Sequence, residues 1–377
     1  MNGHDVGVVS NSLPVLYSFN GHGCLLLPSG SAPLTADMGK KKHLPSYCGT
    51  LCRYALILFL GLLYPDVSKA QDPFFSQFFT TRLFLNPGFA GATESINGFA
   101  SYRSQWSPSD NRYETIFAGY DQPSEFLHGG VGGHVMNDRV SNLLNRFSAA
   151  VIYAYHLQVT RDFYIQAGFQ VSLNQRKLAF DQLIFPDMID PASGVLLPTQ
   201  EVLGRDQKVY MDYSVGFVGF SGEWYGGLAI HHLTRPKQSD ANSEGSELPR
   251  KFTIHLARNI KISGHPNRDD AWWVTPDIMV QNQGSFYYLK YGAHISRNPV
   301  FIGVQSRHDF QFNYTSIIFS FGYLNKTVGF TYSYDVSMSK LQRFTPSNGA
   351  HEVSLLIKIP YGRAKSKTID AIKLPLH

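Results

Sequence analysis

The sequence predicts an all-β protein, an antiparallel transmembrane β-barrel of about 14 strands in an outer membrane. Three observations predict it: the composition, an export signal, and apolar and polar residues that alternate along most of the remaining chain. Charged residues make up 16% of the chain, below the roughly 25% of soluble domains, and aromatic residues reach 14%. This composition argues against a disordered chain or a coiled coil, and the unclustered net charge of +5 argues against nucleic acid as a partner.

A segment typical of a secretory signal peptide precedes the alternating part of the chain. The apolar run 54–64 follows several basic residues and precedes small residues at Ser68 and Ala70. Its 11 residues are too few for a membrane-spanning helix, which needs about 20. We therefore predict that residues 38–70 direct export through the general secretory pathway and that the mature chain begins at Gln71. A buried hydrophobic helix is the alternative.

The stretch before this signal is not expected to belong to the exported protein. Signal peptides start close to their basic region, yet residues 1–37 precede Met38. We interpret residues 1–37 as an upstream read-through that is not part of the natural translated protein, or as an aberrant leader. An unusually long leader is the alternative. A lipoprotein anchor is not expected, because no cysteine follows the apolar run.

Alternation of apolar and polar residues defines the strands of the mature chain. Phe169 and Val171 alternate with Gln170 and Ser172, for example, as is typical of a strand with two different faces. The alternating segments are about 9–13 residues long, which fits a tilted crossing of a bilayer better than the roughly 5–6 residues of strands in soluble sandwiches. The expected strands lie near 95–106, 112–121, 127–137, 146–158, 162–174, 209–220, 223–233, 250–262, 271–282, 285–296, 299–307, 315–324, 326–335 and 350–359.

The composition of the two faces indicates the environment of these strands. The polar face is rich in Gly, Ser, Thr, Gln and His and has few charges, whereas the outer face of a soluble sandwich would carry many Lys, Glu and Asp. The apolar face has Tyr near strand ends, as expected at a lipid interface. Because a sheet in a bilayer must pair all its backbone groups, we expect a closed barrel rather than a secreted β-sandwich or jelly roll.

The lengths of the connections support a barrel. Barrels of this class have short turns on the periplasmic side and longer loops outside. Short connections are expected at 159–161, 221–222, 297–298 and 325, and long ones, on the opposite parity, at 175–208, 234–249 and 336–349. The short connection 283–284 breaks the pattern, and 263–270 is a long turn for the periplasmic side.

The mature amino terminus does not alternate. We assign residues 71–94 to an amino-terminal segment on the periplasmic side, 95–359 to the barrel and 360–377 to a basic tail. The apolar stretch 72–79 is either a docking element for a periplasmic partner or a first strand or wedge against the barrel. A second apolar stretch lies in the loop 175–208, where it either marks a protein contact or folds back into the barrel mouth. The candidate partner-contact residues are Phe74, Phe75, Phe78, Phe79, Ile184, Phe185 and Met188.

No cofactor, metal or catalytic site is expected, so the chain is not expected to be an enzyme. All cysteines precede Gln71. On one strand, His231 and His232 would point to opposite faces and so would not chelate one ion. The glycine-rich run 129–133 lacks the Gly-Lys-Ser/Thr ending of a phosphate-binding loop and fits a strand that makes close contacts. A Gly-x-Ser-x-Gly nucleophile motif is also missing.

Four stretches together resemble the PorP/SprF family, outer-membrane components of the type IX secretion system of Bacteroidota. Their order spans nearly all of 71–359, and Gly88 departs slightly from the family, which more often has Ala there. The stretches are Gln71–Phe79 with Leu85–Gly91; Tyr102–Trp106 with His128–Gly132 and Asn137–Arg139; His232–Pro236 with Leu248–His255; and Tyr332–Asp335 with Ser339–Leu341 and Gly349–Glu352.

The resemblance implies a non-enzymatic outer-membrane barrel in the secretion and gliding machinery. Its partners would be outer-membrane lipid, other type IX secretion components and a large secreted adhesin whose export or surface anchoring it supports. Two other functions stay open: a porin or hydrophobic-solute transporter, and a secreted β-sandwich that binds glycans. A porin favours opposed charges in its lumen, and a glycan site favours exposed Trp, of which the chain has only 4.

Overall fold

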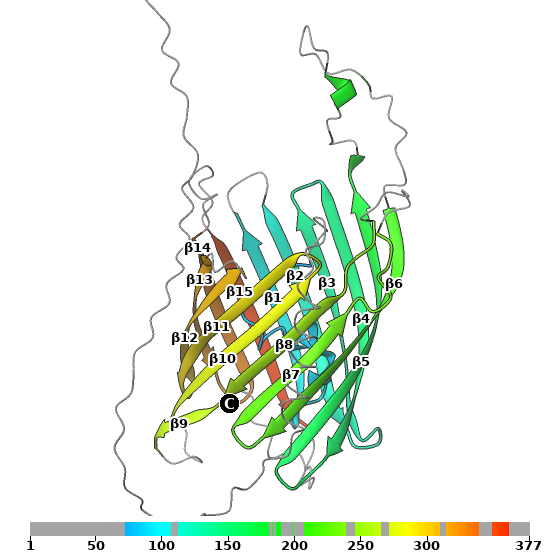
Figure 1. Ribbon diagram of the computed structural model, residues 1–377. Helices are drawn as coiled ribbons and strands as arrows, with labels where there is room; N and C mark the ends of the chain where they lie inside the picture. The colour runs from blue at the N-terminus through cyan, green and yellow to red at the C-terminus, as the bar shows by residue number, and fades with distance from the viewer. Residues whose placement is uncertain are drawn as a thin grey trace, which may run out of the picture. The chain divides into compact units, whose positions relative to one another are not determined.

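The alternating segments form strands that lie side by side in one sheet (Figure 1). The computed structural model describes residues 72–106, 112–180, 183, 186–189, 198, 207–238, 246–264, 271–309, 314–338 and 349–361. The strands are β1 (Ser95–Gln105), β2 (Tyr113–Ser124), β3 (Gly129–Val140), β4 (Leu144–Gln158), β5 (Phe163–Leu178), β6 (Gln207–Ser221), β7 (Trp224–His231), β8 (Lys251–Arg258), β9 (Ile260–Ser263), β10 (Trp272–Gln283), β11 (Phe286–Arg297), β12 (Val300–Asp309), β13 (Tyr314–Leu324), β14 (Val328–Ser337) and β15 (Ala350–Pro360). The short helices are α2 (Arg82–Leu85), η1 (Pro87–Phe89) and η3 (Pro186–Met188).

The sheet closes on itself. Each strand pairs antiparallel with its neighbours in the chain, and β15 pairs with β1 from Ser95↔Pro360 to Gln105↔Ala350. Strands β8 and β9 both pair with the same edge of β10, and only Asn259 separates them, so they are two pieces of one barrel strand. The described residues therefore form a closed antiparallel barrel with 14 strand positions. The predicted fold class is confirmed, and the sandwich and jelly-roll alternatives are excluded.

The connections divide the barrel into two ends. We call the end where β1 finishes the loop end, which is uppermost in Figure 1, and the end where β1 begins the turn end. The long connections β5–β6, β7–β8 and β14–β15 are at the loop end, and the short ones at 159–162, 222–223, 298–299 and 325–327 are at the turn end. The predicted parity holds for these connections. The loop end has two short turns against it, the predicted one between β10 and β11 and a three-residue turn between β3 and β4.

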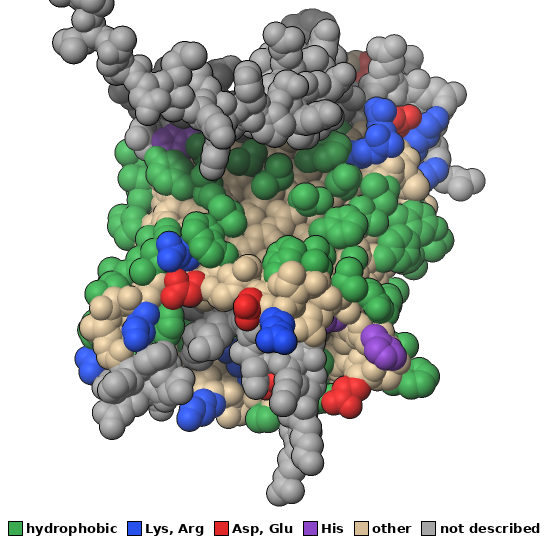
Figure 2. Space-filling view, turned by 60° about the horizontal axis from the view of Figure 1, so that its bottom comes forward, with side chains coloured by type: hydrophobic (Ala, Val, Ile, Leu, Met, Phe, Trp, Pro, Cys, Tyr) green, Lys and Arg blue, Asp and Glu red, His purple; other side chains and the backbone are tan. Residues whose placement is uncertain are grey.

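The two faces of the strands differ as predicted. The side chain of Phe169 on β5 is 46% exposed on the outside, while that of its neighbour Gln170 is 6% exposed and faces the lumen. Figure 2 shows hydrophobic side chains in a broad band across the visible barrel face, with most of the Lys, Arg, Asp and Glu side chains below this band and at its upper right. Further outward-facing apolar residues include Val151, Leu173, Met211, Ile254, Ile302, Val304, Phe319, Phe321, Leu355 and Ile357.

None of the helices in the described residues is long and apolar enough to cross a membrane. The predicted signal peptide (38–70), the stretch 1–37 and nearly all of the tail 360–377 lie outside the described residues. The described part begins at Asp72, and the residues between it and β1 position the site described next.

Candidate functional site

Residues 72–92 cross the lumen of the barrel, and we call this segment the plug. Asp72 contacts residues at the loop end of the barrel, whereas β1, which follows the plug, begins at the turn end. The plug therefore runs through the barrel from one end to the other, and Figure 1 shows it in blue inside the ring of strands. We expected residues 71–94 on the periplasmic side. The structure instead corresponds to the alternative, a wedge packed against the barrel wall.

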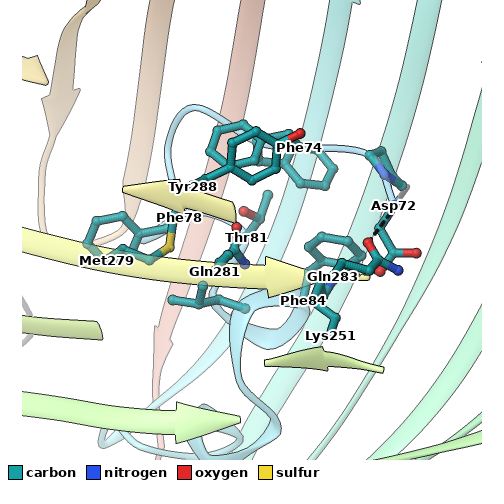
Figure 3. Close-up of a pocket in the computed structure, with 13 residues that line it drawn as sticks. Asp72, Phe74, Phe78, Thr81, Phe84, Lys251, Met279, Gln281, Gln283 and Tyr288 are labelled. Carbon is teal, nitrogen blue, oxygen red and sulfur yellow. Dashed lines mark hydrogen bonds and ion pairs between the residues drawn. The ribbon is translucent and has the colours of Figure 1, made fainter. Parts of the chain in front are cut away.

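Asp72 anchors the plug at the loop end. Its Oδ2 lies 2.7 Å from Nζ of Lys251 on β8 (Figure 3). The same oxygen lies 2.9 Å from Nε2 of His232, and Nδ1 of His232 lies 2.7 Å from Oδ2 of Asp212. Burial opposes the charge on His232, but the carboxylates of Asp72 and Asp212 outweigh it and raise the pKa of His232 to about 9. Burial likewise opposes the charge on Asp72, yet His232 and Lys251 hold the pKa of Asp72 well below its usual range.

A second anchor lies deeper in the lumen, around Ser76. The Glu352 carboxylate accepts hydrogen bonds from the backbone N–H of Ser76 at 2.7 Å and of Gln77 at 3.1 Å. Arg103 on β1 lies 3.2 Å from Glu352 and 2.9 Å from Asp335 on β14. The Ser76 hydroxyl donates to Asp335 and accepts from Arg103. Three strands thus hold one residue of the plug.

Lys290 on β11 completes this second anchor from another part of the wall. Its side chain is fully buried and donates a hydrogen bond to the carbonyl of Ser76. The ammonium also lies 5.2 Å from the ring centroid of Phe78. Because a buried charge is costly unless it is paired, each wall charge favours the plug in place over a lumen without it.

The third anchor lies toward the turn end. Arg82 of α2 makes two hydrogen bonds to the carboxylate of Asp121 on β2, at 2.8 and 3.0 Å, and both side chains are buried. Asn97 on β1 donates to the same carboxylate at 2.9 Å. The Arg82 guanidinium also lies over the ring of Phe99, 4.8 Å from its centroid. Both hydrogen bonds come from Nη2 of Arg82, and with the contact to Phe99 they hold α2 against β1 and β2.

The Asn-Pro-Gly-Phe sequence forms the narrow end of the plug. Asn86 is the N-cap of η1, where its Oδ1 accepts from the N–H of Gly88 at 2.8 Å, and Pro87 at the first position of η1 suits the helical φ. The Asn86 side-chain amide donates to the carbonyls of Phe217 and Leu228, at 3.1 and 3.2 Å. The plug backbone is thereby attached to β6 and β7.

Two glycines of the wall allow the plug backbone to approach. A Cβ at Gly168 on β5 would lie 2.3 Å from the carbonyl carbon of Pro87, and a Cβ at Gly130 on β3 would lie 2.2 Å from the carbonyl oxygen of Ala90. Such distances are too short for any side chain. Gly130 belongs to the run 129–133, which starts β3 and makes the close contacts that its composition predicts.

The predicted contact residues of the amino-terminal segment lie inside the barrel. Phe75, Phe78 and Phe79 are buried, and Phe74 is half-buried with its ring centroid 5.9 Å from that of Tyr288. Phe75 packs against Phe117, and Phe79 packs against His294 and Phe301, all edge to face. Their burial leaves them little surface for a periplasmic partner.

The predicted contact residues in the loop 175–208 are only partly described. Met188 lies in η3 and is half-buried, and the neighbouring Ile189 is 47% exposed. Ile184 and Phe185 lie outside the described residues.

The two adjacent histidines do not face opposite sides as predicted. Strand β7 ends at His231, and His232 has a positive φ of 58°, which turns its ring toward the plug. His231 Nε2 lies 3.2 Å from the carbonyl oxygen of Leu85, and His232 contacts Asp72. Alternation applies only within a strand, so it does not hold at this boundary. In the described part of the chain, no group of three or more His, Cys, Asp and Glu is placed to hold a metal ion.

The residues that hold the plug were missed at the sequence level. Each is a charge on a lumen-facing position, and all but Glu352, whose strand also carries Lys358 on that side, are alone on a strand face without other Lys, Arg, Asp or Glu. This isolation is the signal that could have identified them. They are Arg103, Asp121, Lys251, Lys290, Asp335 and Glu352. Each pairs with the plug or with another wall charge. Together, these wall charges can hold a polypeptide segment in the lumen.

The sequence of this chain matches the model of one protein family. A family model described as "Type IX secretion system membrane protein PorP/SprF" matches residues 67–357. No curated protein matches the sequence.

Several solved barrels are similar at low identity. The toluene transporter TbuX of Ralstonia pickettii is 10% identical with a TM-score of 0.42, over 74% of this chain and 92% of its own. Omp33 of Acinetobacter baumannii is 7% identical with a TM-score of 0.36, and a mutant porin of Rhodopseudomonas blastica is 5% identical with a TM-score of 0.31; each match covers 70% of this chain and 99% of the other. With TM-scores below 0.5, these likenesses carry no argument about function.

Proposed function

Because the chain belongs to the PorP/SprF family of type IX secretion system membrane proteins, we propose that it works by contact, as a plugged outer-membrane barrel that supports export or surface anchoring of a large adhesin. In this proposal it catalyses no reaction, and its partners are other components of the secretion and gliding machinery, the adhesin and the surrounding lipid. The family and the barrel fold point to the outer membrane as its location.

The observation that carries the proposal is the attachment of the plug. Asp72, Ser76, Arg82 and Asn86 are bonded to wall strands on different sides of the barrel. Free diffusion through the lumen requires that this network be absent or broken. A barrel whose lumen-facing charges hold a plug is better suited to binding a partner protein than to letting solutes pass.

The plug also changes which surfaces are available for a partner. Because Phe75, Phe78 and Phe79 are buried in the lumen, the contact surfaces that remain are the connections at the two ends. By the general rule for such barrels, the loop end with its long connections faces the cell exterior. We therefore keep the loop 175–208, with Ile184, Phe185 and Met188, as the proposed contact with the adhesin.

Replacing residues 183–191 with a Gly-Ser linker of equal length tests this proposal. We expect a folded barrel in the outer membrane and the loss of one large protein from the cell surface, measured by surface proteomics. The matched control is the same replacement of 240–245, a polar stretch in another loop-end connection. An unchanged surface proteome in the first variant would contradict the proposal.

A hydrophobic-solute transporter is the second candidate, and one observation favours it. A mainly apolar pocket lies beside the plug at the loop end, lined by Phe74, Phe78, Phe84 and Met279 among others. If replacing 183–191 left secretion and adhesion unchanged while uptake of a small apolar solute fell, this second function would replace the first.

We also propose that the exported protein begins at Gln71. Asp72 is hydrogen-bonded at the loop end, so any longer amino-terminal extension would have to emerge there after passing through the lumen. Cleavage between Ala70 and Gln71 leaves one residue before this anchor. Amino-terminal sequencing of protein from carbonate-extracted membranes tests the proposal, and a product that retains 54–64 would contradict it.

A further inference from the structure

A pocket at the loop end lies between the plug and the wall strands β8, β10 and β11 (Figure 3). It is partly open, and the space within it and at its mouth is about 510 Å³, a figure that includes open solvent. Most of its lining is apolar, with rings from the plug on one side and Met279 of β10 on the other. The apolar lining residues are Pro73, Phe74, Phe75, Phe78, Phe84, Leu85 and Met279.

One polar side chain in this lining has an unused donor. Gln283 is 6% exposed, and its Oε1 accepts a hydrogen bond from the backbone N–H of Asp72 at 3.0 Å. The backbone N–H of Asp72 can only donate, so the atom of Gln283 that faces it must be the oxygen Oε1. The nitrogen Nε2 therefore points the other way. Among the described residues, Nε2 of Gln283 has no hydrogen-bond partner. Buried donors are rarely left unpaired, since each one costs free energy.

The other polar groups of the lining are already engaged. Lys251 Nζ lies 2.7 Å from Asp72 and 4.3 Å from the ring centroid of Phe84. Gln281 Nε2 donates to Thr253 Oγ1 at 3.0 Å. The unused donor of Gln283 therefore stands within a surface of aromatic rings, a thioether and aliphatic groups. Pockets of this composition, mainly apolar with few placed polar groups, are typical of ligand sites.

We propose that this pocket binds an apolar group that carries one hydrogen-bond acceptor, such as a phenyl or isobutyl group next to a carbonyl or a carboxylate. The apolar group packs against Phe78, Phe84 and Met279, and the acceptor receives a hydrogen bond from Nε2 of Gln283. A free solute and an amino-acid side chain of a polypeptide share this chemistry. The proposal stands apart from the proposed secretion role, because it concerns the pocket alone.

The pocket is built jointly by the plug and the wall, and this has a consequence for the ligand. A ligand that contacts both stabilises the state in which the plug is in place, and it does not bind when the plug has left. Occupancy should therefore slow any opening of the plug. The mature chain contains no cysteine, so a single cysteine at Thr81, which lines the pocket, reports both occupancy and opening through its alkylation rate.

The test uses two probes with the purified full-length mature barrel. Phenylacetate represents a free solute, and N-acetyl-L-phenylalanine methylamide represents a side chain of a polypeptide. Saturation-transfer NMR measures binding, and maleimide labelling of the Thr81→Cys variant measures protection. We expect saturable binding of at least one probe and slower labelling in its presence. Binding of only one probe identifies the source of the ligand, and either result supports the proposal.

Three variants test the geometry. Gln283→Glu keeps the acceptor for Asp72 but replaces the free donor, so affinity should fall roughly tenfold or more. Met279→Phe fills the pocket and should abolish binding, while Ile278→Phe, the next residue on β10 but 44% exposed on the outer face, should leave affinity unchanged. Heat-modifiable gel mobility checks that each variant is folded.

The opposite results overturn the proposal. They are the absence of saturable binding by both probes, or binding that Gln283→Glu leaves unchanged. Equal affinity of Met279→Phe and Ile278→Phe would also place the ligand elsewhere. If Met279→Phe does not fold, Gln283→Glu and the labelling of Thr81→Cys still decide the question.

Discussion

Nζ of Lys251 lies 2.7 Å from Oδ2 of Asp72, so a cation on a wall strand fixes the first described residue of the chain at the loop end of the barrel. Because β1 begins with Ser95 at the opposite end, residues 72–92 have to cross the lumen. This one contact sets the direction of the plug. It also shows that the amino-terminal segment does not form the periplasmic arm that the sequence predicts.

Replacing Lys251 with Met should loosen the plug. It leaves the buried carboxylate of Asp72 with His232 as its remaining charged partner, and removing one member of a buried pair typically costs about 3–5 kcal/mol, less here because His232 stays. The matched control is Arg258→Met, which breaks the exposed pair with Glu223 and should cost less than about 1 kcal/mol. Urea unfolding of the reconstituted barrel measures both, and equal costs would contradict this anchor.

The anchor at the loop end should weaken at alkaline pH. The pKa of His232 is raised from 6.5 to about 9, so its charge stabilises the fold fully below pH 6.5, and that contribution is lost as the pH rises through about 9. The pKa of Asp72 is lowered, so its contribution is present above about pH 4 and is lost only on acidification. The charged groups facing His232 are Asp72, Asp212 and, through Asp72, Lys251.

Unfolding of the wild type and of His232→Gln at pH 6 and pH 10 checks this pH dependence. The wild type should lose at most about 3 kcal/mol between the two values, the free energy that corresponds to this pKa shift. The loss should be clearly smaller in His232→Gln. The same loss in both proteins would show that another group is responsible.

A methyl group at Gly168 should displace the plug. Its Cβ would lie 2.3 Å from the backbone of Pro87, so η1 or β5 has to shift, at a cost of roughly 1–3 kcal/mol for overpacking. In Gly98→Ala the nearest atom to the new Cβ lies 4.0 Å away, and stability should barely change. The unfolding temperatures of Gly168→Ala and Gly98→Ala measure the difference, and that of Gly168→Ala should be lower. Equal values would mean that the plug does not pack against β5 as described.

Much of the barrel could be predicted from the sequence, because alternation is a local property. Phe163–Leu178 forms β5 where alternation predicts a strand at 162–174, and Phe169 and Gln170 face the predicted sides. The number of strand positions follows from the count of such segments, and the closure follows from the need to pair all backbone groups of a sheet in a bilayer. The boundaries shift by a few residues, and a local pattern does not determine them.

The plug could not be predicted in the same way. Its anchors join residues that are far apart in the chain, and Ser76 and Glu352 are separated by 276 residues. Alternation indicates that Glu352 faces the lumen but not which residue it meets there. The sequence marks 72–79 as apolar and non-alternating, and only the structure shows that its phenylalanines pack inside the barrel.

Arginine at position 169 should prevent assembly of the barrel. Phe169 is on the outer face, and a cation near the bilayer midplane costs about 2–4 kcal/mol in barrels of this kind. The inward control has to be small, because Gln170 is buried beside an occupied lumen and an arginine there would lack room. Gln170→Asn should therefore assemble normally. Heat-modifiable mobility of membrane fractions compares the two, and equal assembly would show that the faces are assigned wrongly.

Swelling of liposomes in small sugars tests whether the plug fills the lumen and closes it to solutes, as expected of a barrel that works by contact. The wild-type mature protein should give little swelling, and deletion of residues 72–92 should give rapid swelling from a barrel that still shows folded, heat-modifiable mobility. Rapid swelling with the wild type, at the rate of the deletion variant, would show that the lumen is open and that the plug does not block it.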